Sequence, residues 1–351
     1  MSAVKLAEYI WMDGHAPTQH LRSKARVVHV PDPNAVSVST FPRWQYDGSS
    51  TYQATGHDSD LLLDPVAFVN DPIRGNGNYL VMCEVLNADG TPHASNSRAR
   101  LRAVLDAGAA KVDTWFGFEQ EYTLFQGRDP LGWPKGGYPA PQGPFYCGIG
   151  ADECFGRDMV ERHTQACIDA GLMIHGINAE VMPGQWEFQI GHRGFPGEEA
   201  NALAACDHLW FARYLLYRVG EDFGVSATLH QKPVRGDWNG AGMHTNFSTR
   251  EMRDPKTGRK AVDDVIKRLE AKHHAHLSEY GHGLEQRLTG LHETSSMERF
   301  SYGAANRGAS VRIPRSIDLL GYGYIEDRRP GANADPYRVA GRILKSIAGL
   351  D

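Results

Sequence analysis

Residues 115–125, WFGFEQEYTLF, alternate between two kinds of side chain. Glu119 and Glu121 occupy odd positions, whereas the even positions hold Phe116, Phe118, Tyr122 and Leu124. Because successive side chains of a strand point to opposite faces, the segment predicts a strand with an aromatic back and two carboxylates in front. The two carboxylates would lie about 7 Å apart at ~3.3 Å per residue, a spacing that suits two neighbouring cations.

Three further segments present polar residues in the same alternating way. They are residues 178–191 (NAEVMPGQWEFQIG) with Glu180 and Glu187, residues 237–249 (DWNGAGMHTNFST) with His244, Asn246 and Ser248, and residues 323–330 (GYIEDRRP) with Glu326 and Arg328. One pair of glutamates on a strand is usually only a solvated face. Several such strands, backed by aromatic residues, instead predict the inner wall of a curved sheet that binds Mg²⁺ or Mn²⁺.

Arginines gather in the C-terminal part of the chain, at Arg287, Arg307, Arg312 and Arg328. Metal ligands combined with several arginines predict a polyanionic substrate, such as a nucleoside triphosphate together with a carboxylate. Phosphoryl transfer needs that combination, because its catalysis consists mostly of positioning and charge neutralisation. The chain has no GxxxxGK[ST] sequence, which excludes an ordinary P-loop fold.

The chain has 351 residues, a formal net charge of -5 and 41% hydrophobic residues. This globular composition excludes a disordered or coiled-coil chain, and the acidic balance argues against a nucleic-acid partner. The sequence contains neither the roughly 18–20 apolar residues of a membrane helix nor the uninterrupted apolar run of a signal peptide, so no membrane partner is expected. Five cysteines without a CxxC pair indicate reduced thiols and a cytoplasmic location.

The length favours two domains, residues 1–110 and residues 111–351. The first is expected to be β-rich, with strands at residues 8–13, 25–30 and 79–86 and then a helix at residues 95–109 with Ser95 as its N-cap. The second is expected to contain a loop at residues 137–150 and helices at residues 156–171, 202–223 and 262–280.

In their order along the chain, these motifs resemble glutamine synthetase, in the short-subunit type common to eukaryotes and some bacteria. The resemblance runs from residues 8–14 (EYIWMDG) to residues 333–337 (NADPY). Besides the strand segments above, it includes WQYDGSSTYQATGHDSD (44–60), PQGPFYCGIGAD (141–152), RLTGLHET (287–294) and NRGASVRIPR (306–315). It implies an α+β fold, in which an N-terminal β-grasp domain precedes a catalytic domain built on a curved antiparallel sheet flanked by helices.

The resemblance also implies a reaction, the ATP-dependent ligation of ammonia to L-glutamate through a γ-glutamyl phosphate. Two or three Mg²⁺ or Mn²⁺ ions per site are implied as cofactors. One metal would order glutamate and resembles a site formed by Glu121, Glu180 and Glu187. The metal on the nucleotide phosphates resembles a site formed by Glu119, His244 and Glu326.

Substrate-binding roles follow from the same resemblance, matched motif by motif. Glutamate would be bound by Asp237, Trp238, Arg287, Arg307 and Arg328. ATP would be bound by Glu119, Glu187, Asn246, Ser248, Arg307, Arg312, Tyr324, Ile325 and Glu326.

Catalytic roles are implied for Arg307 and Arg328 and for three residues that handle ammonia. Asp47 in YDGSS would take the proton from ammonium, Glu293 in HET would close over the intermediate, and Tyr146 lies in the neighbouring loop. Family members form a double ring of ten subunits. The implied partner is therefore further copies of this chain, with Asp47 completing the site of a neighbour.

One segment, HRGFPGEEANALAACDHLW (192–210), departs from the family by being several residues longer and by having His192 where a proline is usual. We expect residues 192–206 to form a surface insertion beside the nucleotide site, outside the core. Asn201 is expected to be the N-cap of the helix that follows.

Two other functions stay open. If an amine replaced ammonia, the chain would be a γ-glutamylamide ligase, although intact Asp47, Tyr146 and Glu293 favour ammonia. A catalytically silent binding or structural homologue would be expected to lose metal ligands, and all of the implied ligands are present. Two features are given ordinary roles. Residues 273–276 (HHAH) are expected on a solvated helix face, and Cys147 is expected to be an inert thiol.

Overall fold

The computed structural model describes residues 3–136 and 138–351. Its N-terminal part is a five-stranded sheet in the order β2-β1-β5-β4-β3. The strands are β1 (Ala3–Met12), β2 (Leu21–Val30), β3 (Trp44–Asp47), β4 (Asp60–Asn70) and β5 (Tyr79–Leu86). β1 and β5 run parallel, and the other neighbouring pairs are antiparallel.

Both faces of this sheet are covered, as its central strand β5 shows. Val81 and Val85 pack with Tyr9 in a core that belongs to the N-terminal sheet itself. Leu80 and Met82, on the opposite face, belong to the main core that extends through the rest of the chain. A strand buried on both sides needs a nearly continuous apolar sequence, which the segment YLVMCEVL supplies.

The remaining strands form a nine-stranded sheet in the order β12-β13-β14-β11-β6-β9-β8, with β7 and β10 paired to β6 outside this path. They are β6 (Trp115–Gln126), β7 (Asp129–Pro130), β8 (Ile174–Ala179), β9 (Gln185–Gly191), β10 (Ser226–Thr228), β11 (Met243–Ser248), β12 (Tyr302–Ala304), β13 (Val311–Ile313) and β14 (Ile325–Asp327). The central strand β6 is antiparallel to both β9 and β11, and β11 is antiparallel to β14.

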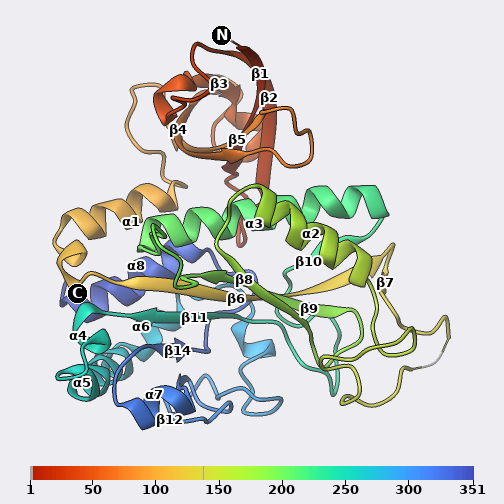
Figure 1. Cartoon of the computed structure of the whole chain (residues 1–351), viewed down its shortest axis with the longest axis vertical. Helices are drawn as coiled ribbons and strands as arrows, with labels where there is room; N and C mark the ends of the chain where they lie inside the picture. Colours follow the sequence, from red (N-terminus) through yellow and green to blue (C-terminus); the bar gives the residue numbers. More distant parts are fainter. Residues whose placement is uncertain (1–2, 137) are drawn as a thin grey trace.

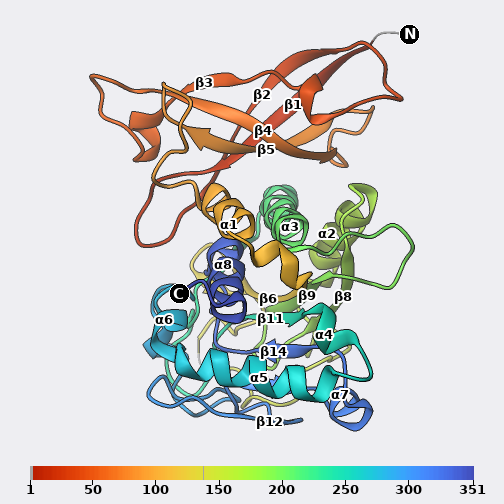
Figure 2. The same cartoon turned by 90° about the vertical axis from the view of Figure 1, so that its left-hand side faces the viewer.

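Helices cover the large sheet on both sides (Figure 1). They are α1 (Ser97–Asp106), α2 (Arg157–Asp169), α3 (Ala202–Phe223), α4 (Arg250–Arg253), α5 (Gly258–Ala271), α6 (His273–Leu277), α7 (Arg315–Leu320) and α8 (Pro336–Ala348). Figure 2 shows α1, α2, α3 and α8 between the two sheets, with α5 and α7 on the opposite side of the large sheet.

A buried ion-pair network attaches the N-terminal sheet to the helix layer. Arg98 of α1 donates two hydrogen bonds of 2.9 Å to Asp207 of α3 and one of 3.0 Å to Glu84 of β5. The hydroxyl of Tyr337 in α8 also donates to Asp207, at 2.5 Å. Because buried charges are costly unless they are paired, this network holds the two parts in one arrangement.

Several expected elements differ in detail from the structure. The helix expected at residues 95–109 begins at Ser97, and its N-cap is Asn96, whose side chain accepts from Ala99 N. The prediction of Ser95 was wrong, since the Ser95 hydroxyl instead accepts a 2.7 Å hydrogen bond from Gln53. The helix expected at residues 262–280 is divided into α5 and α6 at Lys272. In the expected loop at 137–150, residue 137 lies outside the described residues, and residues 138–150 contain neither helix nor strand.

The expectation of a solvated HHAH segment was wrong for two of its histidines. His273 and His276 are buried. His273 shares a 2.9 Å hydrogen bond with Met297 O, and His276 shares one of 2.9 Å with the hydroxyl of Ser346. Those partners lie more than twenty residues away along the chain, so the local polar sequence does not reveal them.

The prediction that residues 192–206 lie outside the core was also partly wrong. Residues 194–197 are exposed, but Ala200, Ala202, Ala205 and Cys206 are buried. The prediction of Asn201 as the N-cap of α3 is confirmed, because its side chain accepts from Ala204 N at 3.0 Å. The domain boundary at residue 110 stays a prediction.

Candidate active site

A cavity of about 840 Å³ lies against one face of the large sheet. Among the described residues, all of those that line it come from positions 115–328. It brings together most of the predicted site residues: Glu119, Glu121, Tyr146, Glu180, Glu187, His244, Asn246, Ser248, Arg287, Glu293, Arg307, Arg312, Tyr324 and Arg328. Asp47, Asp237, Trp238, Ile325 and Glu326 are not among the residues that line it.

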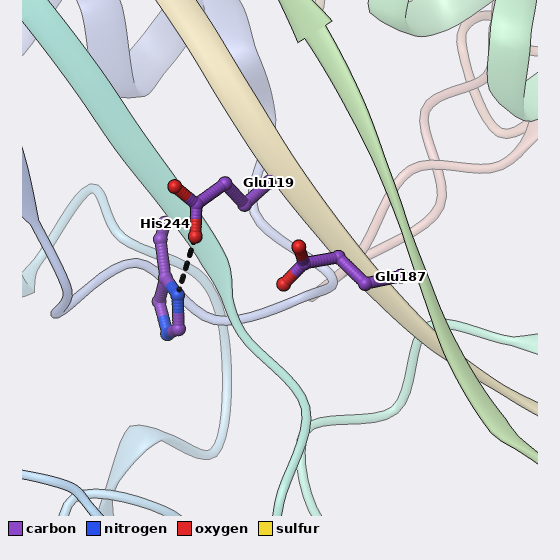
Figure 3. Close-up of side chains that lie close together, drawn as sticks. All are labelled: Glu119, Glu187 and His244. Atoms are coloured by element: carbon purple, nitrogen blue, oxygen red, sulfur yellow. Dashed lines mark hydrogen bonds and ion pairs between the residues drawn. The ribbon is translucent and has the colours of Figure 1, made fainter. Parts of the chain in front are cut away.

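Two groups of possible metal ligands lie side by side in this cavity and share Glu187. The first consists of Glu119, Glu187 and His244, and the second of Glu121, Glu180 and Glu187. Within each group the ligand atoms lie within 4.8 Å of one another. Figure 3 shows the first group, with side chains from β6, β9 and β11 converging on one space.

Strand register produces this convergence. Glu121 of β6 is directly opposite Glu187 of β9, and Glu119 of β6 is directly opposite His244 of β11. Directly opposite side chains on one face of an antiparallel pair are only about 5 Å apart at Cβ, so two neighbouring register pairs are sufficient to assemble a ligand cluster.

The carboxylates of the second group are in an environment that opposes their charge. Burial raises the pKa of Glu121 to about 7, against the lowering effect of Arg287. Burial and the neighbouring Glu121 raise the pKa of Glu180 to about 8. Burial and Glu119 raise the pKa of Glu187 well above its ordinary value. Carboxylates that are buried and repel one another are stabilised when a cation binds between them, so these residues fit divalent metal ions.

His244 is suited to metal binding because its ring is neutral. Burial, reinforced by the nearby Arg328, holds the pKa of His244 well below its ordinary value. Its Nδ1 lies 3.4 Å from a carboxylate oxygen of Glu119 and 3.4 Å from one of Glu326, while Arg287 Nη2 lies 3.1 Å from its Nε2. A neutral imidazole with both ring nitrogens in polar contacts is the form of histidine that binds metals.

Glu326 occupies a different place from the other implied ligands. It is fully buried, and it accepts from Arg328 Nη1 at 2.6 Å and from Arg312 Nε. Glu187 belongs to the group with Glu119 and His244, while the prediction of Glu326 as a ligand beside His244 stays a prediction. The nearest role for Glu326 in this geometry is to orient the two arginines, since each gives it a charge-assisted hydrogen bond.

Two amides support the ligands, although the sequence analysis gave them no role. Asn178 donates a 2.8 Å hydrogen bond to Glu180, and Gln189 donates to Glu187. Gln189 also donates to Asn178 at 2.9 Å, which links the two carboxylates through their amides. The alternation that places Glu187 on the site face also places Gln189 there, so the strand period was a usable signal.

The loop that carries Glu293 has a strained backbone and is hydrogen-bonded to Arg287 and Arg328. His292 and Glu293 have φ values of 52° and 57°, in the left-handed region that costs a non-glycine residue about 1–2 kcal/mol. Arg328 Nη2 donates to Glu293 O at 3.3 Å, and the hydroxyl of Thr294 donates to Arg287 O at 3.0 Å. Strain of this kind is maintained where the surrounding contacts determine the conformation, and it concentrates at functional loops.

Tyr146 also borders the cavity, with about half of its side chain exposed. Burial of the rest of the side chain raises its pKa, and the adjacent Cys147 adds to the effect. The phenol is therefore held in its protonated form, in which it can donate a hydrogen bond.

Part of the cavity lining is an aromatic wall. The rings of Trp115 and His192 lie 4.3 Å apart, and the guanidinium of Arg253 lies 4.1 Å from the centre of the Trp115 ring. The Nδ1 atom of His192 is buried without a hydrogen-bond partner among the described residues. Trp115 shares the odd-numbered face of β6 with Glu119, so this wall and the carboxylate groups belong to one surface.

Asp47, Asp237 and Trp238 do not line the cavity, although Asp237 contacts His292, which does. Asp47 is exposed on the N-terminal sheet, where hydrogen bonds from Ser49 and Ser50 hold its pKa below the ordinary value. The side chain of Asp237 is 98% exposed, and its carboxylate lies 3.2 Å from His292. The ring of Trp238 packs 4.9 Å from that of Trp133.

Adjacent carboxylate groups opposite buried arginines define a class of enzymes that use divalent cations to act on anionic substrates. Comparison with known proteins identifies the family. Residues 3–88 match the model of the glutamine synthetase beta-Grasp domain, and residues 94–262 match that of the glutamine synthetase catalytic domain. The chain belongs to the glutamine synthetase family. The expected α+β fold, a β-grasp domain followed by this catalytic domain, is thereby confirmed.

Similar curated proteins come from distant organisms. A glutamine synthetase of Streptomyces viridochromogenes is 55% identical over 342 residues, which cover 96% of this chain and 95% of that protein. A glutamine synthetase of Kluyveromyces lactis is 52% identical over 345 residues, covering 98% and 89%. A chloroplastic glutamine synthetase of Chlamydomonas reinhardtii is 50% identical over 351 residues, covering 97% and 90%. Within the described residues, no helix combines the length and apolar character needed to cross a membrane.

Proposed function

We propose that the chain catalyses the ATP-dependent ligation of ammonia to L-glutamate, giving L-glutamine, ADP and phosphate. The observation that carries this proposal is the pair of carboxylate groups that share Glu187 in one cavity with Arg287 and Arg328. The relatives, with at least 50% identity over nearly the whole chain, carry the same name for that activity.

Different residues would bind the cation of each substrate. Glu121, Glu180 and Glu187 would hold the cation that orders glutamate. Glu119, His244 and Glu326, with Glu187 beside them, would hold the cation on the ATP phosphates. Mg²⁺ or Mn²⁺ bound there supplies charge neutralisation for phosphoryl transfer. Arg307 and Arg312 reach the same cavity and would bind the transferring phosphoryl group, while Arg287 and Arg328 stabilise charge on the glutamate carboxylates.

Exclusion of water is the second requirement, because an acyl phosphate hydrolyses readily. The strained loop at Glu293 and the loop at Tyr146 both border the cavity. They would close over the γ-glutamyl phosphate, and the Glu293 carboxylate would help to bind ammonium there.

The proton of ammonium needs a base, and we assign it to Asp47 of a neighbouring subunit. Figure 2 shows that the helix layer separates the N-terminal sheet, which carries Asp47, from the large sheet of the same chain. An assembly of ten subunits in two rings would bring an exposed Asp47 to the cavity of the next subunit. The five free cysteines are consistent with a cytoplasmic location for this assembly.

The proposal is tested by measuring ATP-dependent product formation from glutamate with ammonia, hydroxylamine and small amines as acceptors. Ammonia should give glutamine and stoichiometric phosphate at a higher kcat/KM than any amine. If an amine is strongly preferred, the chain is a γ-glutamylamide ligase. No phosphate release with any acceptor would mean a catalytically silent homologue.

A further inference from the structure

A single arginine in the helix layer contacts the back of the sheet directly behind the metal-ligand groups. Arg213 of α3 is only 1% exposed. Its Nε and Nη2 atoms both donate to Gln120 Oε1, at 2.9 and 2.5 Å. Nη2 also lies 3.1 Å from Met243 Sδ, 3.1 Å from Ala332 O and 3.0 Å from Ala334 O. All of these acceptors are neutral.

The hydrogen-bond acceptors of Arg213 are neutral, although the carboxylate of Asp335 favours its charge and the Trp210 ring centre lies 4.7 Å from the guanidinium carbon. Desolvating the charge is still costly at a core position. Burial lowers the pKa of Arg213 to about 10, so the guanidinium nevertheless stays charged at neutral pH. A methionine or leucine would fill similar space without the cost of desolvating a charge. An apolar side chain cannot, however, donate hydrogen bonds in a fixed plane to several chain segments at once.

The acceptors are the back-face neighbours of the site residues. Gln120 lies between Glu119 and Glu121 on β6, and Met243 immediately precedes His244 on β11. Gln120 and Met243 are directly opposite each other in the strand register, so Arg213 contacts both members of one cross-strand pair.

Gln120 extends these contacts to the third segment. Its amide nitrogen donates to Glu121 O at 2.8 Å and to Ala332 O at 3.1 Å. The Ala332 amide in turn donates to Ala241 O at 3.0 Å, just before β11 begins. Arg213 and Gln120 therefore join β6, β11 and the 332–334 segment into one unit behind the cavity.

We propose that Arg213 is a positioning residue for the candidate cation site. Its contacts join β6 to β11 on the face of the sheet opposite the cavity. They fix the distance between the carboxylates of Glu119 and Glu121 and the ring of His244. It acts through Gln120 and Met243 and touches no substrate. The inference rests on the proposed function in one respect, the assignment of those three side chains as cation ligands.

The test is to measure Mn²⁺ binding to the assembled protein without nucleotide, from the electron paramagnetic resonance signal of free Mn²⁺. Arg213→Lys keeps the charge but loses the planar group of donors. We expect it to bind Mn²⁺ at least ~10-fold more weakly, the range found when groups supporting metal ligands are altered. The Mn²⁺ concentration for half-maximal glutamine formation should rise by a similar factor.

Leu216→Ala is the matched control, because Leu216 is a fully buried apolar residue of the same helix. It should lower the thermal stability through a cavity and leave Mn²⁺ affinity unchanged. Wild-type affinity in Arg213→Lys, or an equal loss in Leu216→Ala, would overturn the proposal.

If Arg213→Lys does not fold, Gln120→Glu replaces it in the experiment. This variant keeps an acceptor for Arg213 but loses the amide donor to Glu121 O and Ala332 O, and unchanged Mn²⁺ affinity in it overturns the proposal. A wild type that binds Mn²⁺ without making glutamine would refute the proposed function and leave the role of Arg213 intact.

Discussion

At the scale of single residues, Glu187 has the most demanding position in the site. It is 6% exposed, it belongs to both ligand groups, and the negative charges of Glu119, Glu121 and Glu180 all raise its pKa. Cations bound beside it would stabilise its carboxylate as an anion. Its removal should therefore affect both cation sites at once.

Glu187→Ala and Glu121→Ala are each expected to lower phosphoryl transfer at least ~100-fold while leaving the fold intact, because each removes an anionic ligand from a hard cation. The measurement is phosphate release from ATP with glutamate at saturating Mg²⁺, with circular dichroism to confirm folding. Glu161→Ala, at an exposed position of α2, is the control and should be fully active. Near-normal turnover of either site variant would show that the metal assignment is wrong.

Asp47 is a separate case, because it is exposed and remote from the cavity of its own chain. Asp47→Ala should leave ATP and glutamate binding largely intact and reduce amide formation severely, because it removes both a base and a counter-charge for ammonium. Nucleotide affinity by titration is compared with glutamine production, and Asp89→Ala, at an exposed position of the same domain, serves as control. An equal loss of binding and production would identify Asp47 as structural.

At the scale of elements, residues 192–201 connect β9 to α3. This connection is hydrogen-bonded to the sheet near its end and is exposed at residues 194–197. Its end is attached to the sheet, because Phe116 N donates to Ala200 O at 2.8 Å. Within it, Arg193 pairs with Glu198 at 2.5 Å, while residues 194–197 are exposed. His192 at its start packs against the Trp115 ring in the aromatic wall of the cavity.

Replacing residues 194–199 by a shorter turn should preserve folding and kcat and change mainly the KM for ATP. Loop length contributes little to stability, about 0.6 kcal/mol per doubling, so the trimmed chain should assemble normally. Steady-state kinetics with ATP and glutamate varied separately provides the measurement. An equal change in both KM values, or failure to assemble, would show that the loop has a structural role in a subunit contact.

At the scale of the whole molecule, the proposed function requires that two chains together form one complete site. The cavity is formed by residues of the second domain among those described, while Asp47 lies on the first. If the neighbour supplies Asp47, two defective variants can complement each other.

Asp47→Ala and Glu187→Ala chains, unfolded together and reassembled, should form mixed oligomers that regain part of the wild-type activity. In such mixtures, some subunit interfaces combine an intact Asp47 from one chain with an intact Glu187 from the other. Oligomers of either variant alone contain no such interface. Activity of the mixture is compared with that of each variant reassembled separately, with the mass of the oligomer measured in parallel. No recovery in mixed oligomers of confirmed composition would place Asp47 outside the neighbour's site.

Stability should depend on pH through His276, a buried histidine of α6. Burial lowers the pKa of His276 to about 3, and its neighbours are the Tyr280 hydroxyl at 2.5 Å and Ser346. Between pH 6.5 and 3 the unfolded chain binds a proton that the folded chain excludes. The free energy of unfolding therefore falls as the pH decreases, by about 2 kcal/mol from pH 8 to pH 5 for this one group.

His276→Gln should remove that part of the dependence, and His274→Gln, at an exposed position, should not. Chemical denaturation at pH 8 and pH 5 gives the comparison. The same slope in wild type and His276→Gln would show that this histidine binds protons equally in the folded and unfolded chains, so that burial does not lower its pKa.

Much of the candidate site could be predicted from the amino-acid sequence. The period of two placed Glu119 and Glu121 on one face of β6, and the same rule applied to Glu187 and His244 on their strands. Residue Asn201 was identified as a helix cap because capping depends on backbone groups only three positions away. Such features are local, so they follow from neighbouring residues without knowledge of the fold. The order of the motifs along the chain indicated the family, which the alternating pattern alone did not indicate.

The local sequence pattern does not reveal which distant segments pair with one another. The grouping of Glu187 with both Glu119 and Glu121 depends on the register of three strands, and the hydrogen bonds of Glu326 depend on the positions of Arg312 and Arg328. His276 has a hydrogen-bond partner 70 residues away, and the partners of Arg213 lie 30 to 121 residues away. Period and capping arise within one or two turns of chain, whereas these contacts exist only once packing has selected a single arrangement of the strands and helices.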